Sequence, residues 1–165
     1  MNFGTQFSAD RVYRYTLERD SKYSGGLGTV LFICLNPSTA DETVNDPTVR
    51  RCLGYTERWG YDRLLVGNAF AYRATDPKVM RAAADPVGSD NDVWLLAMVG
   101  EAQRVVCAWG ANCAHQHREN RLIELLSGFD HLYALGFTAA GFPRHPLYMR
   151  ANVEPVPFLR EYSET

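Results

Sequence analysis

Lysine is nearly missing from this 165-residue chain, and its basic residues are almost all arginines. Of the 17 basic residues only Lys22 and Lys78 are lysines, which leaves 15 arginines. Arginine favours planar, bidentate contacts with phosphate or carboxylate groups. The net charge is nevertheless −2, so the chain lacks the strongly positive surface that gives salt-dependent, non-specific affinity for DNA. Any contact with nucleic acid must therefore be a local patch.

The chain also lacks an apolar run of about 18 residues and a basic, then apolar leader at its start. These absences predict a cytoplasmic protein that does not interact with membranes. Its four cysteines include no Cys-Xaa-Xaa-Cys pair, and Cys34 and Cys107 lie inside apolar runs. A buried thiol usually behaves as a small hydrophobic residue, so the pattern disfavours a disulfide framework or a metal cluster.

The proportions of hydrophobic and charged residues are those of a globular domain. Hydrophobic residues make up 46% and charged residues 22% of the sequence, which excludes disordered, collagen-like and membrane proteins. A folded chain of this length buries roughly 70% of the surface that its unfolded form exposes, so it forms a core without cross-links. We therefore expect a single domain over residues 1–165 that needs no cofactor; the oligomeric state is left open.

The first strand patterns predict a β-hairpin near the amino terminus. Residues 12–18 alternate large and polar side chains, and a turn-rich segment, 21–28, leads to the apolar run 29–35. Because that second strand is apolar without alternation, we expect it in the centre of a sheet that helices cover on both faces.

Strands and helices alternate along the rest of the chain. Strands are predicted at 64–67, 104–109 and 131–135, and helices at 46–60, from 75, at 89–101 and at 112–126. The resulting βαβαβαβ order predicts an α/β fold. We expect a three-layer α/β/α sandwich with a central, mainly parallel four-stranded sheet, to which the N-terminal β-hairpin is added.

The loops that follow the four strands mark the expected site, because open parallel sheets bind ligands outside the carboxyl ends of their strands. The candidate residues there are Asn36, Pro37, Ser38 and Asp41 after the first strand, Asn68, Phe70 and Arg73 after the second, Trp109 after the third, and Arg144, His145, Leu147, Tyr148 and Arg150 after the fourth.

Six ordered motifs in these loops and near them span most of the chain. They are Asn36-Pro37-Ser38-Thr39-Ala40-Asp41, Asn45-Asp46-Pro47-Thr48, Asn68-Ala69-Phe70-Ala71, Asp85-Pro86-Val87-Gly88 with Asn91-Asp92, Ala108-Trp109-Gly110 and Pro143-Arg144-His145-Pro146-Leu147-Tyr148. Together they resemble a bacterial and phage family, domain-of-unknown-function family 1643. This resemblance implies a family but no known activity.

A more distant resemblance is to the uracil-DNA glycosylase superfamily. The segment from Cys34 to Ser38 is similar to the Gly-Xaa-Asn-Pro-Gly motif of its mismatch-specific and single-strand-selective branches. His145-Pro146 matches the start of a His-Pro-Ser-Pro motif, and Trp109-Gly110 resembles a feature of the classical branch. The resemblance implies a parallel four-stranded sheet with a site at its strand ends, where Asn36 orients the attacking water and Asn68 reads the edge of the base.

These implied roles fit the chemistry of N-glycosidic bond cleavage. The site must orient a water, stabilise negative charge on the departing base, and hold that base by its edge and its face. The residues for these four tasks, in that order, are Asn36, His145, Asn68 and Phe70. Leu147 or Tyr148 would fill the space that a flipped base leaves, and Pro37, Ser38, Trp109 and Arg144 would line the site, with Arg73 and Arg150 on phosphates.

Two other functions stay open. The classical branch has an aspartate where this chain has Asn36, so a general base is missing from the first motif unless Asp41 supplies it. Its absence favours a non-catalytic module that binds nucleic acid or a nucleotide. The carboxylates of Asp41, Asp46 and Asp92 allow a metal-dependent hydrolase instead. Cys113, His115 and His117 also suggest metal ligands, with Cys113 and His117 on one helical face, but a fourth ligand is not found near them in the sequence.

Overall fold

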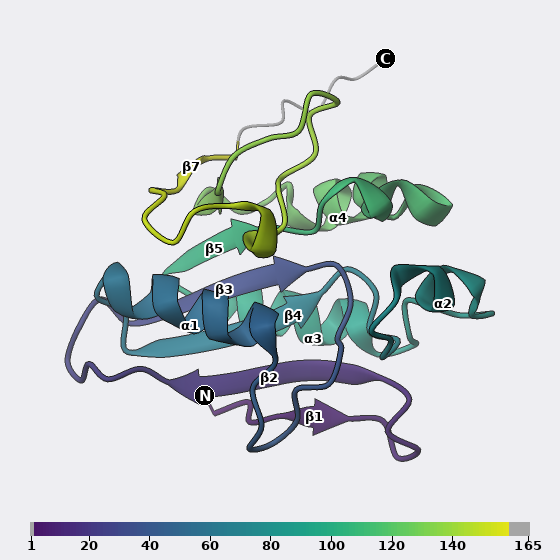
Figure 1. The fold of residues 1–165 in the computed structure, drawn as a ribbon, viewed down its shortest axis with the longest axis horizontal. Coiled ribbons are helices and arrows are strands. Elements are labelled where there is room, and N and C mark those ends of the chain that lie inside the picture. Colours follow the sequence, from purple (N-terminus) through teal and green to yellow (C-terminus); the bar gives the residue numbers. More distant parts are fainter. Residues whose placement is uncertain (1, 159–165) are drawn as a thin grey trace.

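The computed structural model of the protein describes residues 2–158. Within them the chain forms a seven-stranded mixed sheet with four α-helices and two short 3-10 turns (Figure 1). In chain order the elements are β1 (Gln6–Phe7), β2 (Arg14–Asp20), β3 (Thr29–Cys34), α1 (Pro47–Arg58), β4 (Arg63–Asn68), α2 (Pro77–Ala82), α3 (Asn91–Glu101), β5 (Arg104–Cys107), η1 (Ala111–His117), α4 (Arg118–Leu126), β6 (Leu132–Ala134), η2 (Pro146–Tyr148) and β7 (Val156–Pro157).

The strands follow one another across the sheet in the order β1-β2-β4-β3-β5-β6-β7. The four inner strands β4, β3, β5 and β6 run parallel, whereas β1, β2 and β7 join antiparallel at the two edges. Strand β3 is buried along its whole length. The α/β class and the central place of the apolar 29–35 run are therefore confirmed, and the sheet is larger than the four strands and hairpin predicted.

The predicted hairpin is wrong, because β2 does not pair with β3. Strand β2 lies antiparallel to β4 instead, with Leu17 opposite Val66. The connection from β2 to β3 packs against the turn before β4, where Leu27 N donates to Gly60 O at 3.0 Å. A later strand thus occupies the place next to β3. Alternation of side chains identifies a strand but not its partner.

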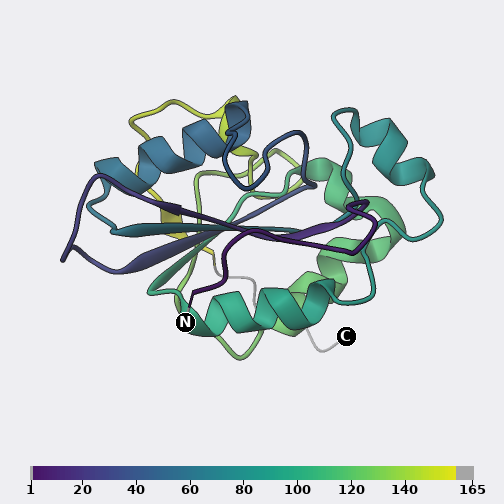
Figure 2. The same ribbon diagram turned by 90° about the horizontal axis from the view of Figure 1, so that it is seen from below.

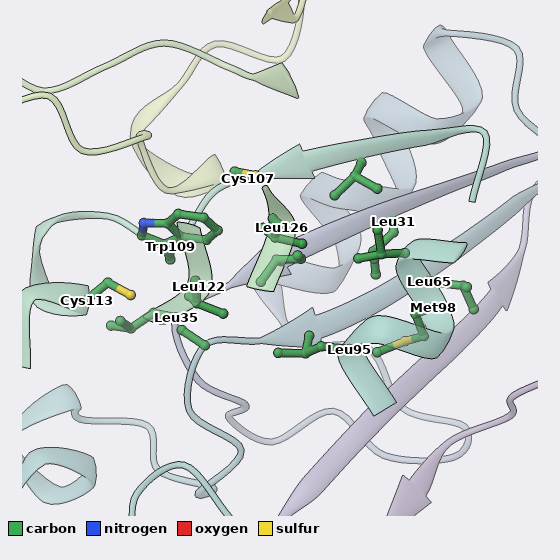
Figure 3. Close-up of a cluster of buried hydrophobic side chains, with 14 of the residues drawn as sticks. Leu31, Leu35, Leu65, Leu95, Met98, Cys107, Trp109, Cys113, Leu122 and Leu126 are labelled. Atoms are coloured by element: carbon green, nitrogen blue, oxygen red, sulfur yellow. The ribbon is translucent and has the colours of Figure 1, made fainter. Parts of the chain in front are cut away.

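Helices cover both faces of the sheet and make three layers (Figure 2). Helix α1 lies on one face, where Val49 and Tyr55 pack with Val30 and Phe32 of β3. Helices α3 and α4 lie on the other face. Their core includes Leu31, Leu35, Leu65, Leu95, Met98, Cys107, Trp109, Cys113, Leu122 and Leu126 (Figure 3).

Two of the predicted helix starts have the expected caps. Asp46 and Asp76 each accept a backbone N–H with their carboxylate, and a proline follows each of them. The predicted helix over 112–126 is interrupted: the 3-10 turn η1 ends at Gln116 and His117, whose φ angles of 54° and 55° are left-handed, before α4 begins. No helix among the described residues is long and apolar enough to cross a membrane.

Candidate functional site

The carboxyl ends of β3, β4 and β5 meet at one edge of the sheet, where α1 also begins (Figure 1). Backbone hydrogen bonds extend the pairing past the strands, since Ala69 N donates to Cys34 O at 2.8 Å and Ala108 N donates to Ile33 O at 2.9 Å. The loops after these strands therefore leave the sheet side by side, as the strand-end rule requires.

Asn36 ties the first of these loops to the second. Its Nδ2 donates to Ala74 O at 2.8 Å and to Pro37 O at 3.2 Å. Because the atoms around this end of the side chain are carbonyl oxygens, the amide must present its nitrogen to them. Asn36 thus keeps Oδ1 as a hydrogen-bond acceptor at the carboxyl end of β3.

Asn68, at the end of β4, is buried, and its side-chain amide makes no hydrogen bond to the described residues. It is 1% exposed and lies opposite Cys34 in the parallel pairing. Neither its Nδ2 nor its Oδ1 has a hydrogen-bond partner within residues 2–158. An unpaired buried amide costs free energy, so few are retained without a reason. This side chain offers one donor and one acceptor to a complementary group.

Arg14 is a second buried polar residue on this face, and the sequence did not single it out. It is 2% exposed, and its Nη1 donates to Ala40 O at 3.0 Å. Burial lowers the pKa of Arg14 to about 10, against the nearby charge of Asp46, which raises it. The signal for Arg14 was its place between two tyrosines of a predicted strand, where a charged side chain is normally exposed.

The Asp46 carboxylate lies near Arg14 but binds the backbone at the start of α1. The carboxylate accepts from Val49 N at 2.9 Å and from Ala40 N at 3.3 Å, and the residue is 4% exposed. Asp46 therefore caps the start of α1. The Asp46 carboxylate also fixes the loop after β3, through Ala40.

The loop that carries His145 crosses this edge from β5 to α1. Gly110 N donates to Pro143 O at 2.8 Å at one end, and Tyr55 Oη donates to Arg150 O at 2.6 Å at the other. His145 Nδ1 accepts from Leu147 N at 3.3 Å. Burial lowers the pKa of His145 to about 4, although Asp46 opposes this shift. At neutral pH His145 is therefore a neutral imidazole whose proton is on Nε2.

Phe70 and Trp109 lie beneath the edge, in the core on the α3 side. They are 0% and 1% exposed. The ring of Phe70 lies 5.9 Å from that of His115, and Trp109 Nε1 donates to Glu119 Oε2 at 2.8 Å. Figure 3 shows Trp109 among the apolar side chains of this core. Both residues thus support the loops that follow β4 and β5.

Pro37, Ser38 and Asp41 shape the loop after β3. Pro37 is buried and its carbonyl accepts from Ala74 N at 2.9 Å, and Ser38 Oγ lies 3.1 Å from Thr75 Oγ1. The Asp41 carboxylate accepts the N–H groups of residues 43 and 44, which lower its pKa. These contacts hold the loop in one shape.

The remaining candidates lie in two segments and range from half-buried to exposed. Leu147 and Tyr148 are 45% and 80% exposed on η2, and Arg144, in the same segment, donates from Nε to Phe137 O at 3.0 Å. The backbone of Arg150 is held by α1, as described above. Arg73 follows β4 and is half-buried, and its guanidinium covers the ring of Phe7 at 4.8 Å.

The acidic residues proposed as metal ligands have other partners. Asp92 forms an ion pair with Arg118 at 2.7 Å, and Asp41 and Asp46 accept backbone N–H groups. No group of three or more His, Cys, Asp or Glu side chains in the described part of the chain is arranged to hold a metal ion.

The structure is thus an α/β fold in which candidate residues gather at the carboxyl ends of β3, β4 and β5. The profile of the family described as "Protein of unknown function (DUF1643)" matches residues 14–147. The chain belongs to this family, as its motifs indicated. Comparison with curated proteins and with solved structures gave no significant match.

Proposed function

We propose that the strand-end edge binds a nucleobase, in a nucleic acid or a nucleotide-type small molecule, and that the protein hydrolyses its N-glycosidic bond. The observation that carries this proposal is the Asn68 side chain, 1% exposed and without a hydrogen-bond partner in residues 2–158. An amide offers a donor and an acceptor in one plane, which is the pattern that base edges complement.

Asn36 and His145 take the two reactive tasks in this proposal. Asn36 has its nitrogen committed to carbonyl oxygens, so its Oδ1 accepts a hydrogen bond from the attacking water. His145 is neutral and has its proton on Nε2, because Nδ1 accepts from Leu147 N. A neutral imidazole donates a hydrogen bond to the base as negative charge develops on it, as a positioned electrophile does, and the proton released by the attacking water passes through solvent to the departed base.

The resemblance to the uracil-DNA glycosylase superfamily supports the same proposal. In that superfamily the site lies at the ends of a parallel four-stranded sheet, and here β4, β3, β5 and β6 are parallel neighbours. The two segments that carry the glycosylase-like motifs, at Asn36 and His145, both reach the edge where α1 begins.

A second function, binding without catalysis, is favoured because the nearby carboxylates already accept backbone N–H groups. Asp41 accepts two backbone N–H groups in a turn, and Asp46 caps α1. A carboxylate held in this way is a poor general base unless the loop changes. A module of this kind would use Asn68 for the base and leave the glycosidic bond intact.

Single-turnover assays on labelled oligonucleotides test the catalytic proposal. Single- and double-stranded substrates would contain uracil, hypoxanthine, mismatched or oxidised bases. We expect base release by the wild type and by a control, Asn120→Ala, whose asparagine is exposed on α4. We expect no release by Asn36→Ala. Absence of release from every substrate, with gel-shift binding retained, would overturn catalysis in favour of the binding module.

Binding itself is tested with nucleosides, which carry a base but no phosphate. Calorimetric titration of wild type and Asn68→Leu is expected to show at least a tenfold loss of affinity in the variant, since about 1.4 kcal/mol corresponds to a factor of ten. If no nucleoside binds, or if Asn68→Leu binds as tightly as the wild type, the proposed base site is wrong.

A further inference from the structure

Two arginines project from the same face of a short antiparallel ribbon beside the strand-end site. Residues 12–14 pair with residues 71–73: Arg14 N donates to Ala71 O at 3.0 Å and Arg73 N donates to Val12 O at 2.9 Å. The central pair is Tyr13 and Tyr72, whose rings lie 5.9 Å apart.

Side chains alternate along such a ribbon, and the two tyrosine rings meet on one face of it. Arg14 and Arg73 therefore lie on the opposite face as diagonal neighbours, at a spacing that long side chains can bridge. This face is turned toward the loop after β3, because Arg14 Nη1 donates to Ala40 O. Two positive groups are thus held side by side where that loop meets the sheet.

The charges of this pair are not balanced by ion pairs. Within residues 2–158 neither Arg14 nor Arg73 lies within salt-bridge distance of a carboxylate. Each donates from Nη1 to a backbone carbonyl, Ala40 O for Arg14 and Arg11 O for Arg73. The Nε of each is buried and has no hydrogen-bond partner in the same residues.

Asp46 is the nearby carboxylate that favours the charge of Arg14, while Arg73 and Arg19 oppose it. Both oxygens of Asp46 already accept backbone N–H groups. Buried charges are normally paired, and Arg118 on the other face of the sheet follows that rule. Arg14 is 2% exposed and has no carboxylate ion-pair partner among residues 2–158, so its charge is available to an anionic ligand.

We infer that Arg14 and Arg73 form an anion subsite that takes a phosphate group of the ligand whose base is bound by Asn68. A phosphate presents several acceptor oxygens, which suit the forked N–H groups of two guanidiniums. Cys34 neighbours both residues: it is paired with Asn68 across the parallel strands, and it is close enough to Arg14 to interact with it electrostatically. The proposed subsite therefore lies next to the proposed base site. The inference rests on the proposed function and narrows its ligand to a phosphorylated nucleoside, free or within a strand.

Inorganic phosphate is the direct probe of this subsite. The full-length protein would be titrated with phosphate at constant ionic strength, with chloride as the reference salt. We expect saturable phosphate binding by the wild type and a dissociation constant at least tenfold larger for Arg73→Gln. Arg58→Gln removes the same charge at the far end of α1, where Arg58 is half exposed, and is expected to bind like the wild type.

A second variant covers the buried arginine. Arg14→Gln risks misfolding, whereas Arg14→Lys keeps the charge and loses the fork of donors, so we expect a weaker but measurable affinity for phosphate. The inference is overturned if phosphate binds no better than chloride, or if Arg73→Gln and Arg14→Lys both bind phosphate as the wild type does.

Paired ligands separate this inference from the proposed function. A nucleoside 5′-monophosphate is expected to bind at least tenfold more tightly than its nucleoside, and Arg73→Gln is expected to abolish that difference while Asn68→Leu weakens both ligands. Equal affinities for the two would overturn the phosphate subsite and leave base binding in place. Arginine-dependent phosphate binding without any nucleoside binding would keep the subsite and overturn the base site.

The same comparison with a short single-stranded oligonucleotide distinguishes the source of the phosphate. A larger effect of Arg73→Gln on the monophosphate supports a free nucleotide, and a larger effect on the oligonucleotide supports a strand.

Discussion

The two faces of the sheet treat a buried arginine in opposite ways. On the α3 side, Arg118 is 4% exposed, donates from Nε to Ala69 O at 2.7 Å and forms an ion pair with Asp92 at 2.7 Å. On the α1 side, Arg14 is 2% exposed and forms no ion pair in the part of the chain that the structure describes. The first arginine contributes to the fold, and the second keeps a charge that the fold does not use.

Two asparagines repeat the contrast. Asn91 Nδ2 donates to Asn68 O at 2.9 Å and to Ala69 O at 3.2 Å, and only its Oδ1 lacks a partner among residues 2–158. The Asn68 side chain lacks a partner at both Nδ2 and Oδ1 in the same residues. A buried polar residue that lowers stability and makes no stabilising contact is expected at a functional site. Arg118 and Asn91 are therefore the buried polar residues to test for stability, and Arg14 and Asn68 are the ones to test for ligand binding.

The largest effect is expected from the arginine on the α3 side. Arg118→Met should lower the free energy of unfolding by about 3 kcal/mol, because it removes a buried guanidinium that donates to Ala69 O and pairs with the partly exposed Asp92. Arg14→Met should lower it by about 1 kcal/mol, since no ion pair is lost. Urea denaturation of both variants measures the difference, and equal losses would remove the distinction between the two faces.

A pH series tests whether His145 is buried as a neutral group on the α1 side. Its folded-state pKa of about 4 lies below the ordinary 6.5, so the unfolded chain takes up the proton first as the pH falls. Stability due to the neutral imidazole is then full above about pH 6.5 and is lost toward pH 4, by about 3 kcal/mol relative to His145→Asn. Parallel pH profiles for wild type and variant would contradict this burial.

The two asparagines give the next effects, which should differ in sign. Asn91→Leu is expected to lower the free energy of unfolding by about 2 kcal/mol, because two buried carbonyls lose a donor. Thermal unfolding and urea denaturation would measure the change. A neutral result would show that Asn91 contributes no more to the fold than Asn68 does.

Asn68→Leu should raise the free energy of unfolding by about 1 kcal/mol, because a similar apolar side chain removes an unsatisfied buried amide. The same protein should lose nucleoside affinity. This opposite movement of stability and binding is the mark of a residue retained for a ligand. A destabilised Asn68→Leu would place Asn68 with the structural residues instead.

Much of the fold follows from local patterns in the sequence. Proline after an aspartate marks the starts of α1 and α2, and the unbroken apolar run of β3 marks a strand covered on both faces. The partner of β2 did not follow, because it depends on β4, which lies more than forty residues later. The break before α4 also escaped the periodicity, since it depends on the left-handed backbone at Gln116 and His117.

The candidate site was predictable only as a region. The strand-end rule located Asn36, Asn68 and the His145 loop at one edge, but it could not tell which side chains are satisfied there. Arg14 shows why: among residues 2–158 it forms no ion pair, because both oxygens of Asp46 already accept N–H groups from Val49 and Ala40. Such a property belongs to the whole hydrogen-bond network and leaves no pattern in one segment.

The pairing of β2 with β4 has a consequence for how the chain folds during synthesis. Because Leu17 must find Val66, the second strand of the sheet leaves the ribosome long before its partner does. Pairings between distant residues are slow, and an unpaired strand edge invites aggregation in the meantime. We expect β2 to dock after β3 and β4 have paired, so that Arg14 reaches its place beside Ala40 only after that pairing.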